Sequence, residues 1–433
     1  MMEGDLLRDD DTAVPHAISL ELFAKLSTGS ASPEEVARIF LPHHIETCPS
    51  CRALHERLQE IKDNLGYFDE LVALLESETA PELARILESL PTMEQLRAAE
   101  TDESFHTWGL CVYLLQQSKE ACLSDARRAT ELAILAVRIA LALPKESYHP
   151  DWVHDLQART FAYLANALKV ANELTAADLA FADAERRFSW HSPLVEAELL
   201  TIKSSLRREQ RRYTEALEAA AAALKIYVDL GDRRGALACQ LLETKVYEAT
   251  QDWANGCDVL QQAENEAGLS GDQRLIAALQ SNLVLHLAGA GRYDEALERL
   301  PRAMEMLAEH GRDTDRLRLR WTEALVLDGL GRIEEAETAL RALQQEFLDR
   351  RMPLDATLVS LDLAVVLFKS GKADALTTLA AELLPIFESR GLTTEAIVAY
   401  TLLQLQRAVE GRTFTLQLAA ELARRVRAEG RGR

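Results

Sequence analysis

Gly291-Arg292-Tyr293-Asp294-Glu295-Ala296-Leu297 decides the fold of this chain, because the pattern recurs at a fixed distance. It returns with a period of 40 as Gly331-Arg332-Ile333-Glu334-Glu335-Ala336-Glu337 and, more loosely and at the same spacing, as Gly371-Lys372-Ala373-Asp374. Six or seven copies at one spacing indicate an array of structural repeats. The other copies are Asn172–Ala177 (one residue off register), Arg211–Leu217, Gln251–Trp253 and Gly411-Arg412.

Each copy has the features of the turn in a helical hairpin. A Gly or Asn in the left-handed conformation ends one helix, and the next helix begins two or three residues later. The residue after the turn is aromatic or aliphatic and is expected to pack back on the first helix. Five residues after the turn, a small side chain lets the two helices approach. The residues after the turn are Tyr213, Trp253, Tyr293 and Ile333, and the small residues are Ala177, Ala216, Gly256, Ala296 and Ala336, replaced by Leu376 and Leu416 in the last two copies.

These columns resemble the tetratricopeptide repeat, whose second helix opens with the same Gly-x-Tyr-x-x-Ala pattern. The usual period of that family is about 34 residues, and the period of 40 here implies longer helices. The resemblance covers residues 150–430 and predicts about seven antiparallel helix pairs, with turns near residues 172, 211, 251, 291, 331, 371 and 411. A buried helical bundle is the alternative, but a bundle would not keep a constant period. Further helices are predicted upstream at Phe68–Leu75, Pro81–Leu90, Thr107–Gln117 and Ser124–Leu143.

A second pattern lies near the start of the chain, where His44, Cys48 and Cys51 have the spacing H-x3-C-x2-C. A Cys-x2-Cys turn places two thiolates on one metal ion, and a His four residues upstream can supply a third tetrahedral ligand. The sequence therefore predicts a zinc site.

The surroundings of this motif resemble the zinc-binding anti-sigma factor domain. Ile18–Leu26 is predicted as a short amphipathic helix, and Thr28–Ala31 as a turn. Ser32-Pro33-Glu34-Glu35 is a helix start, with an N-cap, a Pro and two acids in the first turn. The helix that follows leads to the metal motif, as in that family. The resemblance covers residues 14–60.

The resemblance implies a fourth ligand at the start of the first helix, and His16 occupies that place. The chain departs from the family by two extra residues between the second helix start and the motif. His43 is therefore the alternative to His44, and His55 is a rival fourth ligand. The predicted set is His16, His44, Cys48 and Cys51. A set of four protein ligands leaves no open position for water, so the zinc is expected to be structural.

Members of the resembled family bind a sigma factor and keep it from RNA polymerase. The resemblance thus implies a bacterial transcription regulator whose zinc head binds a sigma factor and whose repeats bind a second protein or signal. The alternative is a scaffold or adaptor subunit of a larger complex, with a purely structural zinc site. The predicted domains are the zinc-binding head at 1–60, a helical linker or cap at 61–104, and a tetratricopeptide-like α-solenoid at 105–433.

Charge and composition narrow the functional classes. The chain has 433 residues and a formal net charge of −21, from 69 acidic and 48 basic residues. Such a charge disfavours direct binding to nucleic acid and favours a basic protein partner. No export signal and no uncharged stretch of membrane-spanning length is present, so a cytoplasmic protein with reduced cysteines and no membrane contact is expected.

No catalytic motif is found: the chain has no P-loop, no G-x-S-x-G and no H-E-x-x-H. We therefore expect a non-enzymatic protein. Two sets of residues outside the zinc motif are expected to be structural. Cys111, Cys122, Cys239 and Cys257 are expected in helix cores, and His106, His149, His154, His191, His286 and His310 show no metal-binding spacing. The predicted groove residues Asn282, Glu323 and Asp362 form no recognisable ligand code.

Overall fold

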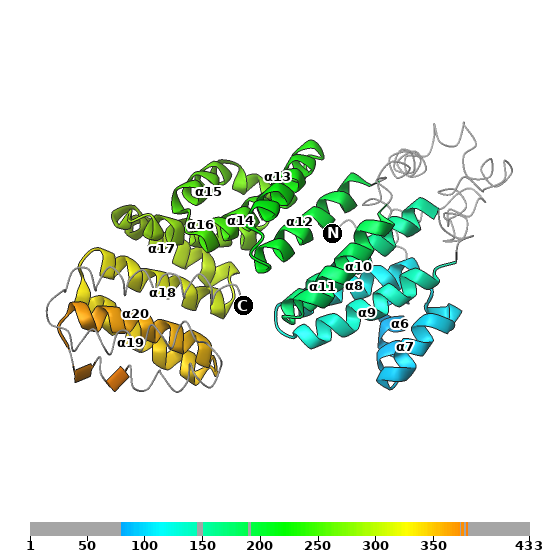
Figure 1. The fold of residues 1–433 in the computed structure, drawn as a ribbon, viewed down its shortest axis with the longest axis horizontal. Coiled ribbons are helices and arrows are strands. Elements are labelled where there is room, and N and C mark those ends of the chain that lie inside the picture. The colour runs from blue at the N-terminus through cyan, green and yellow to red at the C-terminus, as the bar shows by residue number, and fades with distance from the viewer. Residues whose placement is uncertain (1–78, 145–149, 189–191, 373, 376–377, 380–433) are drawn as a thin grey trace, which may run out of the picture. The chain divides into compact units, whose positions relative to one another are not determined.

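The computed structural model describes residues 79–144, 150–188, 192–372, 374–375 and 378–379. Fifteen α-helices, α6 to α20, follow one another in these ranges (Figure 1), and the other regular elements there are two short 3-10 helices. The all-α prediction is confirmed for this part of the chain, and the predicted zinc-bound head lies outside it. The helices are α6 Thr79–Glu88, α7 Thr92–Thr101, α8 Trp108–Ala121, α9 Ala126–Ala142, α10 Pro150–Val170, α11 Leu174–Arg187, α12 Pro193–Glu209, α13 Tyr213–Asp229, α14 Arg233–Thr250, α15 Trp253–Ala267, α16 Gln273–Gly289, α17 Tyr293–His310, α18 Asp313–Gly329, α19 Ile333–Asp349 and α20 Pro353–Lys369.

The predicted repeat is visible in the helix boundaries. From α12 onward the helix starts are evenly spaced, and two consecutive helices make one repeat with the period of 40. Helices of 17 residues, such as α12 and α13, account for the longer period. The starting residues are Pro193, Tyr213, Arg233, Trp253, Gln273, Tyr293, Asp313, Ile333 and Pro353.

The predicted turns each place one residue in the left-handed region. The φ angle is 75° at Gly291 and at Gly331. Where a copy lacks Gly, the chain still adopts this conformation, with φ of 60° at Arg211 and 59° at Gln251. A side chain in this region costs about 1–2 kcal/mol, so packing on both sides must hold these two turns in place. Asn172 and Gly371 complete the set that the sequence predicted, and the turn near residue 411 lies outside the described residues.

The column of small residues is buried among the packed helices. Ala177, Ala216, Ala296 and Ala336 are fully buried, as expected. At Gly256 an added Cβ would lie 2.1 Å from the ring of His286 on α16. Since real Cβ atoms do not approach other atoms so closely, only glycine fits there.

The aromatic residues after the turns connect successive hairpins. Tyr293, at the start of α17, lies against Gly329 near the end of α18, where a Cβ would be 2.3 Å from its ring. Trp253, at the start of α15, lies against Gly289 at the end of α16, also at 2.3 Å from an added Cβ. The sequence predicted packing on the hairpin's own first helix. The structure adds contact with the first helix of the following hairpin, because glycine leaves room for the ring.

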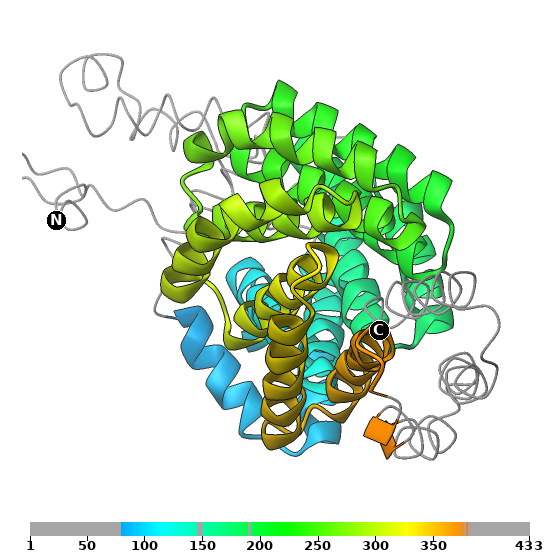
Figure 2. The ribbon, with the colours of Figure 1, turned by 90° about the vertical axis from the view of Figure 1, so that its left-hand side faces the viewer.

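The chain divides into two compact units, Met1–Leu230 and Gly231–Arg433. In the first unit, α8, α10 and α12 contact one another, and α9, α11 and α13 back them as the second helices of their hairpins. The second unit has the same plan, with α14, α16, α18 and α20 in contact; Figure 2 shows the yellow-to-orange helices α18, α19 and α20 side by side. The domain boundaries at residues 60 and 104 remain predictions.

Before the regular array, the helix expected at Pro81–Leu90 is observed as α6, and those expected at Thr107–Gln117 and Ser124–Leu143 as α8 and α9. Helix α7 was not predicted. It buries only Ala99, so it carries little of the apolar periodicity by which a helix is recognised. The helix predicted at Phe68–Leu75 lies outside the described residues.

Gly329→Ala is expected to destabilise the second unit by about 1–3 kcal/mol, because the new methyl group would overlap the ring of Tyr293. This cost exceeds the roughly 1 kcal/mol that alanine gains over glycine within a helix. Gly268→Ala is the matched control, since no heavy atom lies within 4 Å of its added Cβ. Urea unfolding of the full chain measures both, and equal midpoints for the two variants would contradict the proposed contact.

Candidate functional site

The helices α8, α10 and α12 of the first unit are joined by polar side chains, and we call the surface they form the first-helix face. The bonds between α10 and α12 link residues 35 to 39 positions apart, such as Tyr163 to Glu198 and Arg159 to Glu198. This separation follows from the repeat, which places a residue of one first helix beside its counterpart in the next. These residues were not predicted from the sequence. Charged residues separated by one repeat on first helices were the signal that could have found them.

Glu198 is the centre of the first cluster on this face. Its carboxylate accepts two hydrogen bonds from Arg159, from Nε at 2.5 Å and from Nη2 at 3.2 Å. It accepts a third from the hydroxyl of Tyr163 at 3.2 Å, and Lys119 Nζ lies 3.6 Å away. Lys119 also lies 4.2 Å from the centre of the Tyr163 ring, which is a cation–π contact. One carboxylate therefore holds two cations and a phenol in fixed positions.

Burial decides how these groups ionise. Burial by itself would raise the pKa of Glu198, but the charges of Arg159 and Lys119 outweigh it and hold the pKa below its usual value of 4.5. Burial and then the negative charge of Glu198 raise the pKa of Tyr163 well above 10.0. At neutral pH the carboxylate is thus ionised, and the phenol keeps its proton and donates a hydrogen bond to the carboxylate.

A second cluster lies further along the same helices. Lys169 Nζ donates to Asn166 Oδ1 at 2.8 Å and to Ser205 Oγ at 2.7 Å, and so connects α10 with α12. Burial and then the neighbouring charge of Arg208 lower the pKa of Lys169 to about 8. The guanidinium of Arg208 donates to Glu209 at 2.5 Å.

The two clusters together carry more positive than negative charge. Their cations are Lys119, Arg159, Lys169 and Arg208, and their carboxylates are Glu198 and Glu209. This excess is local, because the whole chain has a net charge of −21. The two clusters therefore differ in sign from the chain as a whole and suit an acidic group, although α8, α10 and α12 together carry six basic and six acidic residues.

In the second unit, polar side chains also connect successive first helices. Lys245 donates to Asn282 at 3.0 Å, and Lys369 donates to Asp328 at 2.6 Å. Trp321 Nε1 donates to Asp362 Oδ2 at 2.7 Å. Asp362 is only 3% exposed, so its prediction as a groove residue is wrong: its carboxylate serves the core. Glu323 is half-buried.

The predicted zinc ligands His16, His44, Cys48 and Cys51, and the alternatives His43 and His55, all lie outside the described residues. Among the residues that are described, no three His, Cys, Asp or Glu side chains are grouped as a metal site would need.

The remaining cysteines and His286 behave as structural residues. Three of the four cysteines (Cys111, Cys239 and Cys257) are buried, as expected, and Cys122 is half-buried. His286 is fully buried, with Nε2 3.1 Å from the Thr244 carbonyl oxygen and Nδ1 2.9 Å from that of Asn282. Burial lowers its pKa.

Comparison with solved structures identifies the fold. A Rap protein complexed with competence and sporulation factor is 13% identical, with a TM-score of 0.55 over 74% of this chain and 88% of that chain. The apo form of RapI is 14% identical, with a TM-score of 0.50 over 63% of this chain and 99% of that chain. The similarity extends to the fold alone, an array of tetratricopeptide-like helical hairpins. No family model and no curated protein matches the sequence.

One comparison corrects an expectation drawn from the sequence. Aspartyl phosphate phosphatase F from Bacillus subtilis is 14% identical, with a TM-score of 0.39 over 93% of this chain and 97% of that chain. Its name contradicts the expectation of a non-enzymatic protein, which was based on missing motifs. The absence of three motifs does not exclude an enzyme, because a catalytic site is defined by the geometry of its residues and unrelated sites can carry the same chemistry.

None of the helices between residues 79 and 379, as far as they are described, has the length and apolar character needed to span a membrane.

Glu198→Gln is expected to lower the free energy of unfolding by about 3 kcal/mol at pH 7, because two partly buried cations lose their counter-charge. The folded-state pKa of Glu198 is depressed, so its contribution is present above pH 4.5 and is lost as the pH falls through the folded-state value. The difference between the variant and the wild type should therefore shrink below about pH 4.5.

Glu335→Gln is the control, since it breaks an ion pair with Arg332 that is about half exposed and should change the free energy of unfolding little. Urea titrations at several pH values measure both variants. A loss for Glu198→Gln that does not change with pH would contradict the ionic role of Glu198.

Proposed function

We propose that this chain is a protein-binding regulator that holds an acidic segment of a partner protein on the first-helix face. The observation that carries the proposal is the cation excess of the two clusters, in a chain whose overall charge is strongly negative. Lys119, with its side chain 33% exposed, is the most accessible cation of the Glu198 cluster. An incoming carboxylate would meet a cation that Glu198 and the ring of Tyr163 already hold in place, so little side-chain entropy would be lost on binding.

The comparison with the Rap protein supports this proposal. That protein was solved in complex with competence and sporulation factor, so a repeat array of this fold holds a ligand in at least one protein. The polar bonds between α8, α10 and α12 hold Lys119, which is partly exposed, beside the more deeply buried Arg159, Tyr163 and Glu198.

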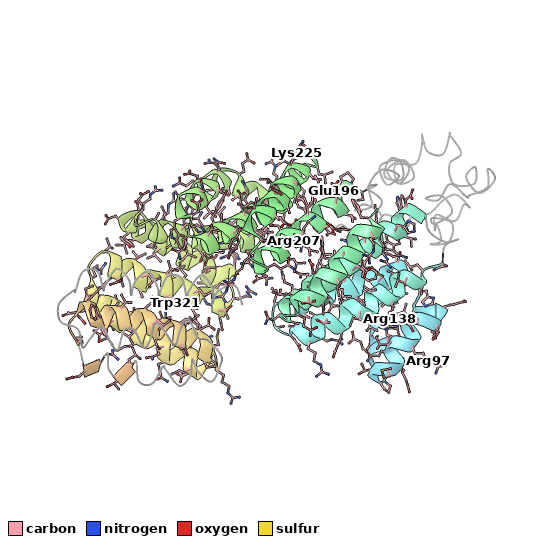
Figure 3. The ribbon with its side chains drawn as sticks, in the orientation of Figure 1. Arg97, Arg138, Glu196, Arg207, Lys225 and Trp321 are labelled. Atoms are coloured by element: carbon pink, nitrogen blue, oxygen red, sulfur yellow. The ribbon has the colours of Figure 1, made fainter. Side chains whose placement is uncertain are left out.

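Lys119→Glu is expected to reduce binding of the partner at least about tenfold, since it reverses the accessible charge of the face. Lys225→Glu is the matched control, because Lys225 projects from the second helix α13 and is exposed (Figure 3). The full chain and both variants are used to capture proteins from the native host, and the amount of each captured protein is compared by mass spectrometry.

A protein that wild type and Lys225→Glu retain, and Lys119→Glu loses, supports the proposal. The proposal fails if every protein captured by the wild type is retained equally by Lys119→Glu. Thermal unfolding of each variant shows whether the substitution has altered the fold.

We also propose that residues 1–60 form a structural zinc site that docks a second protein, with a sigma factor as the candidate that the family resemblance suggests. The donor set of two imidazoles and two thiolates suits the tetrahedral preference of zinc. His16, His44, Cys48 and Cys51 would hold the ion, and its role would be to stabilise a segment too short to form a sufficient core.

Purified protein is expected to contain about one zinc ion per chain, and Cys48→Ser should abolish it because a thiolate ligand is lost. His16→Ala and His55→Ala, measured separately, show which histidine completes the set. The zinc content of the wild type and of each variant is measured by elemental mass spectrometry. Full zinc occupancy in the double variant Cys48→Ser, Cys51→Ser would exclude the site.

A further inference from the structure

The hydrogen bonds of Lys169 go to uncharged groups. Its Nζ donates to Asn166 Oδ1 at 2.8 Å and to Ser205 Oγ at 2.7 Å. Neither acceptor is a carboxylate, so these bonds stabilise the charged form of the amine less than an ion pair would. This environment favours the neutral amine, which is the form that attacks an electrophile.

The charges around Lys169 favour the same form. Arg208 stands 39 residues after Lys169, the separation that also joins Arg159 to Glu198, so its positive charge lies beside the amine. Burial and Arg208 lower the pKa of Lys169 to about 8, against the opposing effects of Glu209 and Cys122. Roughly half of the amine is then neutral at pH 8, compared with less than about 1% for an ordinary lysine.

The neighbouring thiol is a weaker candidate nucleophile. Asn166 Nδ2 donates to Cys122 Sγ at 3.6 Å, so the thiol lies on the other side of the same amide. Burial raises the pKa of Cys122, and a protonated thiol reacts slowly. The amine is thus the reactive group of this cluster.

Arg208 indicates which electrophile the site would take. Its side chain is 18% exposed, and Glu209 is the carboxylate that contacts it. An electrophile with a phosphate leaving group would be drawn to this charge, with its reactive carbon near the amine.

We propose that Lys169 is an acylation site for acyl phosphates. The neutral amine attacks the carbonyl carbon, a C–N bond forms, and the C–O bond to phosphate breaks. Phosphate leaves with the electron pair and carries away the proton that the nitrogen loses, so an amine and an acyl phosphate give an amide and hydrogen phosphate. The product has no charge, which reduces the cation excess of the two clusters. The reaction itself does not depend on the proposed protein partner.

The test treats the full chain with acetyl phosphate and follows each lysine by peptide mass spectrometry. Lys203 is the reference within the same molecule, because it lies on α12 and is paired with Glu185 at 2.7 Å. At pH 8 the initial rate at Lys169 should exceed that at Lys203 about tenfold, since about half of the Lys169 amine is neutral and Lys203 is held in an ion pair with a carboxylate. The rate at Lys169 should also level off above about pH 8.

A second reagent distinguishes the reactivity of the Lys169 amine from the attraction of the phosphate group to Arg208. The uncharged N-hydroxysuccinimide ester of acetic acid acylates amines without a phosphate group. Arg208→Gln should slow both reagents at Lys169, and acetyl phosphate at least about tenfold more than the ester. Arg234→Gln, in the second unit, is the matched control and should change neither rate.

Each outcome decides part of the proposal. If Lys169 reacts no faster than Lys203 with either reagent, Lys169 is not a reactive amine and the proposal is overturned. If Arg208→Gln slows both reagents equally, acyl phosphates are not the preferred reagent class. The comparison of Lys169 with Lys203 uses wild-type protein, so it stands even if the variant fails to fold.

Discussion

The close approach of paired helices is the constraint on which the rest of this structure depends. A small residue five positions after each turn, such as Ala296 or Ala336, is fully buried, and at Gly256 the close neighbour is His286 on the next helix, α16. A larger side chain there would separate the helices and shift the apolar residues that each hairpin presents to the next. Successive hairpins with a small residue at this position pack in the same way. Helices therefore begin at even intervals from Pro193 to Pro353.

Glycine and aromatic residues extend this constraint between hairpins. The rings of Trp253 and Tyr293 occupy the space that Gly289 and Gly329 leave open on the following hairpin. The turns that precede these rings, at Gln251 and Gly291, adopt the left-handed conformation whether or not glycine is present. Tertiary packing therefore holds Gln251 in a backbone conformation that its own side chain disfavours.

The first-helix face is a consequence of the same register. Arg159 and Glu198 meet because one repeat separates them, and Lys169 meets Ser205 for the same reason. The two clusters differ in the groups that contact their lysine amines. Glu198 supplies a carboxylate to Arg159 and Lys119, whereas Lys169 has only neutral oxygens as hydrogen-bond acceptors, and burial and the charge of Arg208 lower its pKa. A regular backbone thus gives two neighbouring lysines different chemistry through the residues placed one repeat away.

The sequence by itself determined the helical class, the period of 40 and the positions of six turns, because a helical-hairpin turn needs glycine, alanine and aromatic residues at fixed spacing. It did not reveal α7, which buries a single residue, or the burial of Asp362 beneath Trp321. Only the tertiary structure decided which charges meet, since Lys119, Tyr163 and Glu198 belong to three helices separated by long stretches of chain. Local patterns specify turns and helix faces, but the ionisation of a side chain depends on neighbours that only packing brings together.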